Sequence, residues 1–158
     1  MTSLAPLAAG AVMAIIGIAG VMAGVPWLFP SLGPTIAIQA ETPEAAVAKP
    51  WNVIVGHFIG AAVGIACVRL TTLAGEPPVN VSLTLSATRV AAAAFAVFAS
   101  MALQRVLKAR HPPAQATTLL VVMGALASDL RGAFVLLAGI LLVAALGEVV
   151  RRWRMPAG

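Results

Sequence analysis

Four apolar stretches of this chain are each long enough to cross a lipid bilayer, and two shorter, proline-broken segments lie between them. The long stretches are residues 4–29, 52–73, 79–107 and 132–150, and the short ones are 31–40 and 114–128. A membrane helix needs about 20 apolar residues to cover a hydrocarbon layer of roughly 30 Å. The sequence therefore predicts an all-α membrane protein with four long transmembrane helices and two short half-helices.

Composition supports a membrane protein and argues against a basic, soluble nucleic-acid-binding domain. Apolar residues make up 61% of the chain and charged residues 9%, whereas about 25% of the residues of a soluble domain are charged. The net charge of +5 comes from basic residues that flank the apolar stretches, without an aromatic-interleaved basic patch. We expect no nucleic-acid partner, and the lipid bilayer is the predicted surrounding.

The distribution of basic residues favours six crossings over four. The two strongest basic clusters lie at residues 105–110 and 151–154. Basic residues prefer the cytoplasmic face, and both clusters reach that face if the segment 114–128 crosses the membrane rather than dipping in and returning. We therefore expect both termini in the cytoplasm.

The order long, short, long occurs twice, which predicts two inverted repeats within one membrane domain, residues 1–158. The first repeat covers about 4–73 and the second about 79–154. The segment 31–40 is too short to cross as a plain helix, because ten residues span about 15 Å. It must be partly extended or re-entrant, and non-helical backbone at this depth needs an internal cavity.

Both short segments open with prolines and neutral hydrogen-bonding side chains. Proline suits the first turn of a helix, and a helix N-terminus carries unpaired N–H groups and a partial positive charge that favour an anion. We expect the two helix starts, entering from opposite sides, to converge on one desolvated anion site, although each residue alone could be an ordinary helix cap. The candidate residues are Ser31, Gly33, Pro34, Thr35, Pro113, Gln115, Thr117 and Thr118.

The helix predicted after the first short segment begins near Asn52 and carries glycines at every fourth position, Gly56, Gly60 and Gly64. Such a glycine face lets another segment approach closely, either within the chain or in a second subunit. Because so short a chain has little bulk to surround an aqueous path, we expect a homo-oligomer, with a dimer favoured. Asn52 and Gly56 join the candidate site.

The two histidines are the remaining candidate site residues. His57 lies inside a predicted span, where a polar ring usually faces a cavity or a partner. His111 follows Arg110 and can either line the pathway or cap a helix. Imidazoles change charge near neutral pH, so the pair could couple anion entry to proton movement. Of the other charges, we expect Arg89 to extend from a span end toward water or to face the ion.

Three other function classes compete with anion transport. A metal or cation carrier could use His57 and His111, but the span interiors lack the acidic residues that a cation path favours. A non-transporting scaffold or assembly subunit would need only the glycine faces. Catalysis is not expected, because the chain has no His-Glu-x-x-His and no Gly-x-Ser-x-Gly motif. No cofactor and no bound metal are predicted.

Three motifs in order resemble the HPP family of integral membrane proteins. They are Ser31-Leu32-Gly33-Pro34, Asn52 followed by Gly56-His57, and His111-Pro112-Pro113-Ala114. Members of that family have been assigned nitrite transport in bacteria and plastids. The resemblance implies a transporter of nitrite or a similar small anion in a bacterial inner membrane, with four or so spans.

This sequence departs from the family pattern at two places. Lys49-Pro50-Trp51-Asn52 stands where the family has Gln-Pro-Arg-Asn, and Gln115 stands where a glycine is common. Both departures lie beside candidate site residues, so they bear on which anion is recognised.

Overall fold

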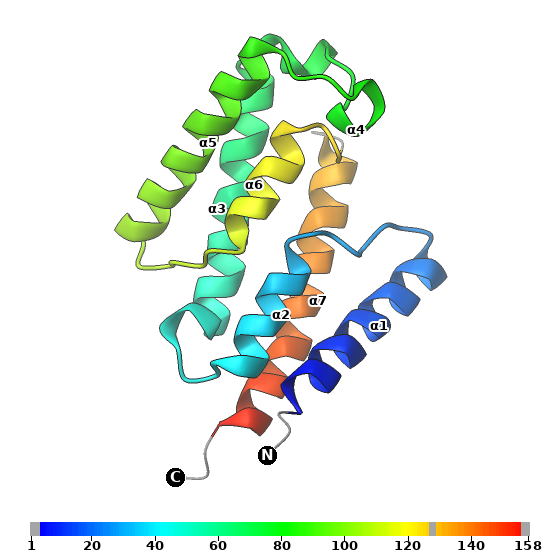
Figure 1. Cartoon of the computed structure of the whole chain (residues 1–158), viewed down its shortest axis with the longest axis vertical. Coiled ribbons are helices and arrows are strands. Elements are labelled where there is room, and N and C mark those ends of the chain that lie inside the picture. Colours follow the sequence, from blue (N-terminus) through cyan, green and yellow to red (C-terminus); the bar gives the residue numbers. More distant parts are fainter. Residues whose placement is uncertain (1–3, 127–128, 156–158) are drawn as a thin grey trace.

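The chain forms helices joined by loops, with no strand among the residues described, 4–126 and 129–155, in a computed structural model (Figure 1). This confirms the predicted all-α class. The α-helices are α1 (Ala5–Ala23), α2 (Leu32–Glu41), α3 (Pro50–Arg69), α4 (Val79–Ser82), α5 (Ala87–Val106), α6 (Ala114–Val122) and α7 (Leu130–Arg154). Two 3-10 helices, η1 (Ala46–Ala48) and η2 (Thr72–Gly75), lie in the loops before and after α3.

Four of these helices, α1, α3, α5 and α7, are long and apolar enough to cross a membrane, as predicted. α1 ends at Ala23, earlier than the predicted range 4–29, because Gly24 takes a left-handed conformation with φ 66°. That conformation is typical of a helix C-terminus and is available to glycine without steric cost.

The third long helix begins later than the predicted range 79–107. Residues 79–82 form the separate short helix α4, which ends where Leu83 takes a φ of 54°. α5 then begins at Ala87, with Ser86 as its N-cap: the Ser86 hydroxyl accepts the N–H of Arg89 at 3.1 Å. A serine N-cap satisfies one of the otherwise unpaired first amides of a helix.

The two short segments form half-helices. α2 has 10 residues and α6 has 9, so each spans about 15 Å or less. The loop between α1 and α2 has no regular structure at residues 26–29, and in Figure 1 it runs sideways from the end of α1 to the start of α2, which then descends. We expected the segment 31–40 to be partly extended or re-entrant; the partly extended form is wrong, because Leu32–Glu41 is helical throughout and only the loop before it is irregular. The re-entrant form stays a prediction. For the second short segment, predicted at 114–128, the helix α6 ends at Val122. Residues 127–128 of that range lie outside the described residues.

The elements of the two halves run in opposite directions. In Figure 1, α1 rises, α2 descends and α3 rises, whereas α5 descends, α6 rises and α7 descends. The start of α1 and the end of α7 lie at the same end of the molecule. The candidate spans are the four long helices, and the six crossings stay a prediction. The inverted repeat itself stays a prediction.

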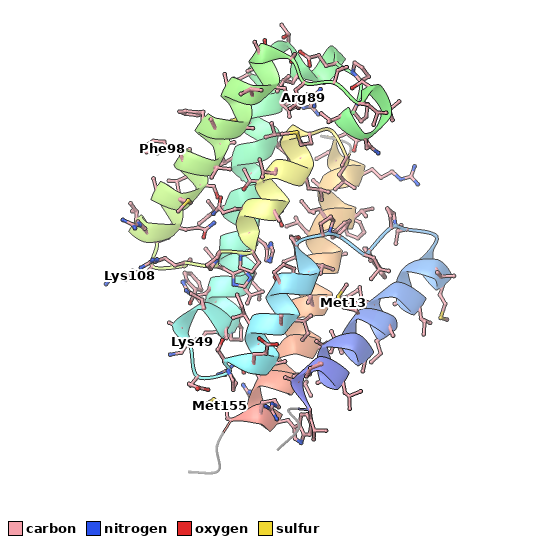
Figure 2. All side chains as sticks on the ribbon, in the orientation of Figure 1. Met13, Lys49, Arg89, Phe98, Lys108 and Met155 are labelled. Carbon is pink, nitrogen blue, oxygen red and sulfur yellow. The ribbon has the colours of Figure 1, made fainter. Side chains whose placement is uncertain are left out.

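The interior is built around α3 and α7. α3 contacts α5, α6 and α7, and α7 also contacts α1 and α2. Large apolar side chains are exposed instead on α1 and α5, among them Val21 and Phe98. Figure 2 shows Phe98 pointing away from α5. Such surfaces are unfavourable in water and match hydrocarbon chains, so they support a chain embedded in a bilayer.

The glycine face of α3 packs against α6 of the same chain. A Cβ added at Gly60 would lie 2.7 Å from the carbonyl oxygen of Ala114, and one at Gly64 would lie 3.0 Å from the Cβ of Val121. The predicted close approach is confirmed, with α6 as the partner. This face is therefore covered within one chain, and the predicted dimer stays a prediction that must rest on another surface.

Candidate functional site

The starts of the two half-helices lie in contact with each other. The hydroxyls of Ser31, at the start of α2, and Thr117, in the first turn of α6, are 2.9 Å apart. Thr35 Oγ1 of α2 lies 3.0 Å from Nε2 of His111, which precedes α6. These four side chains and His57 are at most 1% exposed, and we call them the central cluster: Ser31, Thr35, His57, His111 and Thr117.

Thr35 joins the two imidazoles of the central cluster. Its hydroxyl oxygen lies 2.9 Å from Nε2 of His57 and 3.0 Å from Nε2 of His111, and it also lies 2.8 Å from the carbonyl oxygen of Ser31. The two rings meet edge to face, with their centroids 4.9 Å apart. His57 Nδ1 lies 2.7 Å from the hydroxyl of Thr117. Each half-helix thus reaches both the other half-helix and α3 through hydroxyl–imidazole contacts.

The carbonyl of Val47 determines which nitrogen of His111 carries hydrogen. His111 Nδ1 lies 2.8 Å from that oxygen, which can accept but cannot donate. Nδ1 therefore holds the proton of the neutral ring, and Nε2 is the acceptor that faces Thr35. The carbonyl oxygen of Ser31 accepts from the same Thr35 hydroxyl at 2.8 Å, so it competes with Nε2 of His111 for one proton.

The hydroxyl of Thr117 directs the rest of the cluster. Thr117 donates to the hydroxyl of Ser31 at 2.9 Å, so its oxygen accepts the N–H at Nδ1 of His57 when both rings are neutral. Nε2 of His57 is then an acceptor, as is Nε2 of His111. These two atoms and the carbonyl oxygen of Ser31 therefore all face the single proton of Thr35.

The predicted bare amides are occupied in α6. The N–H groups of Ala114, Gln115 and Ala116 bond to the carbonyls three residues earlier, at 3.0, 3.1 and 3.1 Å. The sequence predicts that these groups face an anion directly, and this is wrong for the conformation described. Short bonds of this kind are a usual way to satisfy the first turn of a helix. The convergence of the helix starts is nonetheless real, and it is made by side chains rather than by amides.

Arginines hold the opposite ends of both half-helices. Nη1 of Arg89 donates to the carbonyl of Val122 at the end of α6, at 2.7 Å, and Nε of Arg154 donates to the carbonyl of Ala40 near the end of α2, at 3.2 Å. A cation at the C-terminus balances the negative end of the helix dipole. The positive ends of both dipoles therefore point at the central cluster.

Other candidate residues support the segment that carries His111. Asn52 Nδ2 donates to the carbonyl of Arg110 at 2.9 Å. A Cβ added at Gly56 would lie 2.8 Å from the Cβ of His111, so glycine at this position lets the loop lie directly on α3. Thr118 is buried on the other side of α6, where its hydroxyl donates to the carbonyl of Ala114 at 3.2 Å.

The remaining predicted residues do not reach the central cluster by a recorded contact. Pro113 is buried and is the residue before the first turn of α6, whereas Pro34 is exposed in the first turn of α2. Gly33 is half-buried. Gln115 is half-buried and turns instead toward a neighbouring pocket at the end of α5.

Sequence reasoning missed Gln104 and Ser100. Gln104 Oε1 accepts the backbone N–H of His111 at 3.0 Å, and its Nε2 donates to the hydroxyl of Ser100 at 3.1 Å. Both residues are at most 2% exposed and share a face of α5 with the alanines at positions 92 and 96. The sequence did carry a sign of this contact: two polar side chains four residues apart follow small residues at the same spacing. An amide inside a membrane helix needs a polar partner, so this pattern predicts a buried contact.

Arg89 was assigned the wrong environment. We expected it to extend toward water or to face the ion, but it is 2% exposed. Its Nη2 donates to the carbonyl of Pro77 at 3.1 Å and lies 3.3 Å from a carboxylate oxygen of Glu76. Arg89 thus joins the loop between α3 and α5 to the end of α6, and its role is structural.

Comparison with known proteins places the whole described fold in one family. Residues 2–155 match the family described as HPP, transmembrane region. No curated protein and no solved structure matches the chain. Since the match covers nearly the full length, the chain belongs to the HPP family of integral membrane proteins.

Proposed function

We propose that this protein transports a small inorganic anion, nitrite foremost, and that the central cluster is its binding site. Membership of a membrane family with four apolar spans supports a transport-type role. The observation that carries the proposal is the contact between the two half-helix starts, through Ser31, Thr117, Thr35 and His111. A scaffold would not need two helix starts to meet inside an apolar domain.

The electrostatics of the central cluster favour a negative ligand. Each half-helix directs about half a positive charge toward it, and its members offer hydroxyl and imidazole N–H donors without a carboxylate. Neutral donors can replace the water around a small anion and still release it. The cluster is closed in this conformation, so an anion must replace contacts between its members, and transport requires the half-helices to separate.

A metal or cation carrier is the second candidate. His57 and His111 point their Nε2 atoms at the same hydroxyl, which is the feature that favours it. Within the described ranges, however, no group of three or more His, Cys, Asp or Glu side chains lies close enough to hold a metal ion. We therefore rank this candidate below anion transport, and we propose no catalytic role.

For the cellular setting we propose a bacterial inner membrane with both termini in the cytoplasm. The start of α1 and the end of α7 share one end of the molecule (Figure 1), and in Figure 2 Lys49 lies near that end while Arg89 lies at the other. The basic cluster at 151–154 belongs to the same end. Fusing a reporter to each terminus tests this orientation, and a periplasmic signal from either fusion would contradict it.

Flux through purified protein in liposomes separates the candidate functions. Nitrite, nitrate, chloride and a divalent metal are tested in turn, and we expect nitrite flux above that of empty liposomes. His57→Ala and Thr35→Ala should each lower that flux, whereas Thr42→Ala is the control, because Thr42 is exposed in the same segment and bonds the carbonyl of Ile38. Metal flux without nitrite flux would favour the carrier of cations, and no flux at all would favour a scaffold.

A further inference from the structure

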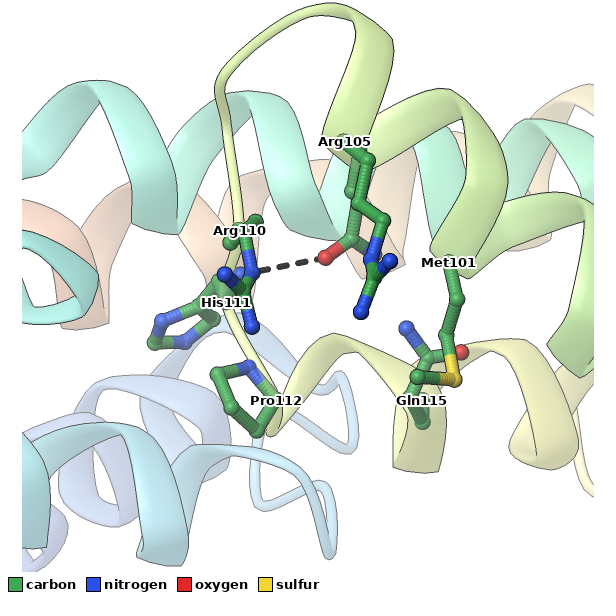
Figure 3. A pocket seen from close by; sticks show the side chains of 7 residues that line it. Met101, Arg105, Arg110, His111, Pro112 and Gln115 are labelled. Carbon is green, nitrogen blue, oxygen red and sulfur yellow. Dashed lines mark hydrogen bonds between the residues drawn. The ribbon is translucent and has the colours of Figure 1, made fainter.

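A small pocket lies beside the central cluster, between the end of α5, the loop 107–113 and the first turn of α6 (Figure 3). Its volume is about 110 Å³. The polar side chains that line it include Arg105, Arg110 and Gln115. In Figure 3 the guanidinium groups of Arg105 and Arg110 both turn toward the space between these segments.

The charge in this pocket is not balanced within the described chain. Neither guanidinium makes a recorded hydrogen bond or ion pair with the residues at 4–126 and 129–155, and none of the described lining residues carries a carboxylate. By contrast, Arg89 and Arg151 each pair with a glutamate. Two unpaired guanidiniums at one small concavity attract anions, and their planar forks suit the oxygens of an oxyanion.

The amide of Gln115 adds a neutral donor to this pocket. In Figure 3 its nitrogen lies on the side of Arg105, whereas its Oε1 turns toward Met101. That oxygen is buried without a hydrogen-bond partner and does not face the open space. The NH₂ group is therefore the part of Gln115 that can donate to an oxyanion.

We propose that the pocket is a docking site for a small oxyanion, with Arg105, Arg110 and Gln115 as its ligands. This inference rests on the proposed transport function and names the step before the anion reaches the central cluster. His111 connects the two sites. It lines the pocket, its backbone N–H is held by Gln104, and its ring turns away from Arg105 toward Thr35.

Kinetics of the pocket variants test the proposal. In Arg105→Gln/Arg110→Gln we expect KM for nitrite to rise about tenfold, with the maximal rate kept within about twofold, because screened charges near a binding site act mainly on capture. Lys108→Gln is the matched control: Lys108 is an exposed cation of the same loop but does not line the pocket. An equal change in both variants, or an unchanged KM in the double variant, would overturn the docking site.

A binding measurement separates this proposal from the transport function. Phenylglyoxal modifies arginines, and peptide mass spectrometry reports each site in detergent-solubilised protein. We expect nitrite to slow modification of Arg105 and Arg110 at least threefold and to leave Arg131, at the start of α7, unchanged. Protection without flux would contradict the transport function alone, and flux without protection would contradict the docking site alone.

A phospholipid phosphate presents the same oxyanion chemistry, and a further arm distinguishes it. The modification is repeated with added phosphatidylglycerol in place of nitrite. Protection by nitrite in the lipid-free sample supports the docking site. Protection by phosphatidylglycerol alone would assign the two arginines to a lipid headgroup and overturn it.

Discussion

Removing the Thr35 hydroxyl tests the role of the central cluster most directly. Thr35→Val keeps the shape and the β-branch of the side chain and deletes the oxygen that faces two imidazoles, at 2.9 and 3.0 Å. The carbonyl of Ser31 loses its contact with the hydroxyl. His57 and His111 then each lose a partner while both remain fully buried.

The expected magnitude follows from the number of contacts and from the membrane setting. In water-soluble proteins a buried polar group left without its partner costs about 1–3 kcal/mol, which would give about 2–6 kcal/mol for two rings. Hydrogen bonds between membrane helices average about 0.6 kcal/mol and reach about 1.7, because the unfolded chain in the membrane also finds partners. We therefore expect Thr35→Val to destabilise the fold by about 1–3 kcal/mol.

Two measurements and two control variants complete this test. Reversible unfolding in mixed detergent micelles reports the free energy, and nitrite flux in liposomes reports transport. Thr35→Ser keeps the hydroxyl and should retain most of the flux, whereas Thr42→Val removes an exposed hydroxyl from the same segment and should change stability by less than about 0.5 kcal/mol. The reasoning is refuted if Thr35→Val unfolds and transports like the wild-type protein.

Three further predictions concern the surroundings of the cluster. Gly56→Ala should displace the loop that carries His111 and lower the free energy of unfolding by about 1–3 kcal/mol, because the added Cβ would lie 2.8 Å from the Cβ of His111. Gly10→Ala is the control, because an added Cβ there meets nothing within 4 Å. Equal unfolding free energies of the two variants would contradict the prediction. Nitrogen-15 NMR should find the neutral ring of His111 protonated at Nδ1, since that atom faces a carbonyl; an Nε2-protonated ring would be inconsistent with the assigned network. Arg89→Met should lower the free energy of unfolding by about 2–4 kcal/mol, because it removes a buried charged donor from the carbonyl of Val122. Hydrogen exchange of the backbone amides at the end of α6 should become faster. Unchanged exchange there would show that Arg89 does not cap α6.

The long helices and the two half-helices could be predicted from the sequence because they depend on local properties. A stretch such as residues 132–150 has the apolar length of a membrane span, and prolines near 34 and 113 predict helix starts. The spacing of Gly56, Gly60 and Gly64 likewise predicts a close neighbour on one face of α3. Composition alone determined that the chain belongs in a bilayer, because so few charged residues cannot cover a soluble fold.

Tertiary structure decided which neighbour each side chain meets, because such contacts join positions far apart in the chain. Ser31 and Thr117 are 86 residues apart and their hydroxyls touch. Spacing along one helix cannot reveal that α6 covers the glycine face of α3, that Gln104 holds His111, or that Arg89 caps a half-helix instead of reaching water. Each of these contacts is set by how separate helices cross, and a polar group inside the membrane takes whichever partner that crossing brings within reach.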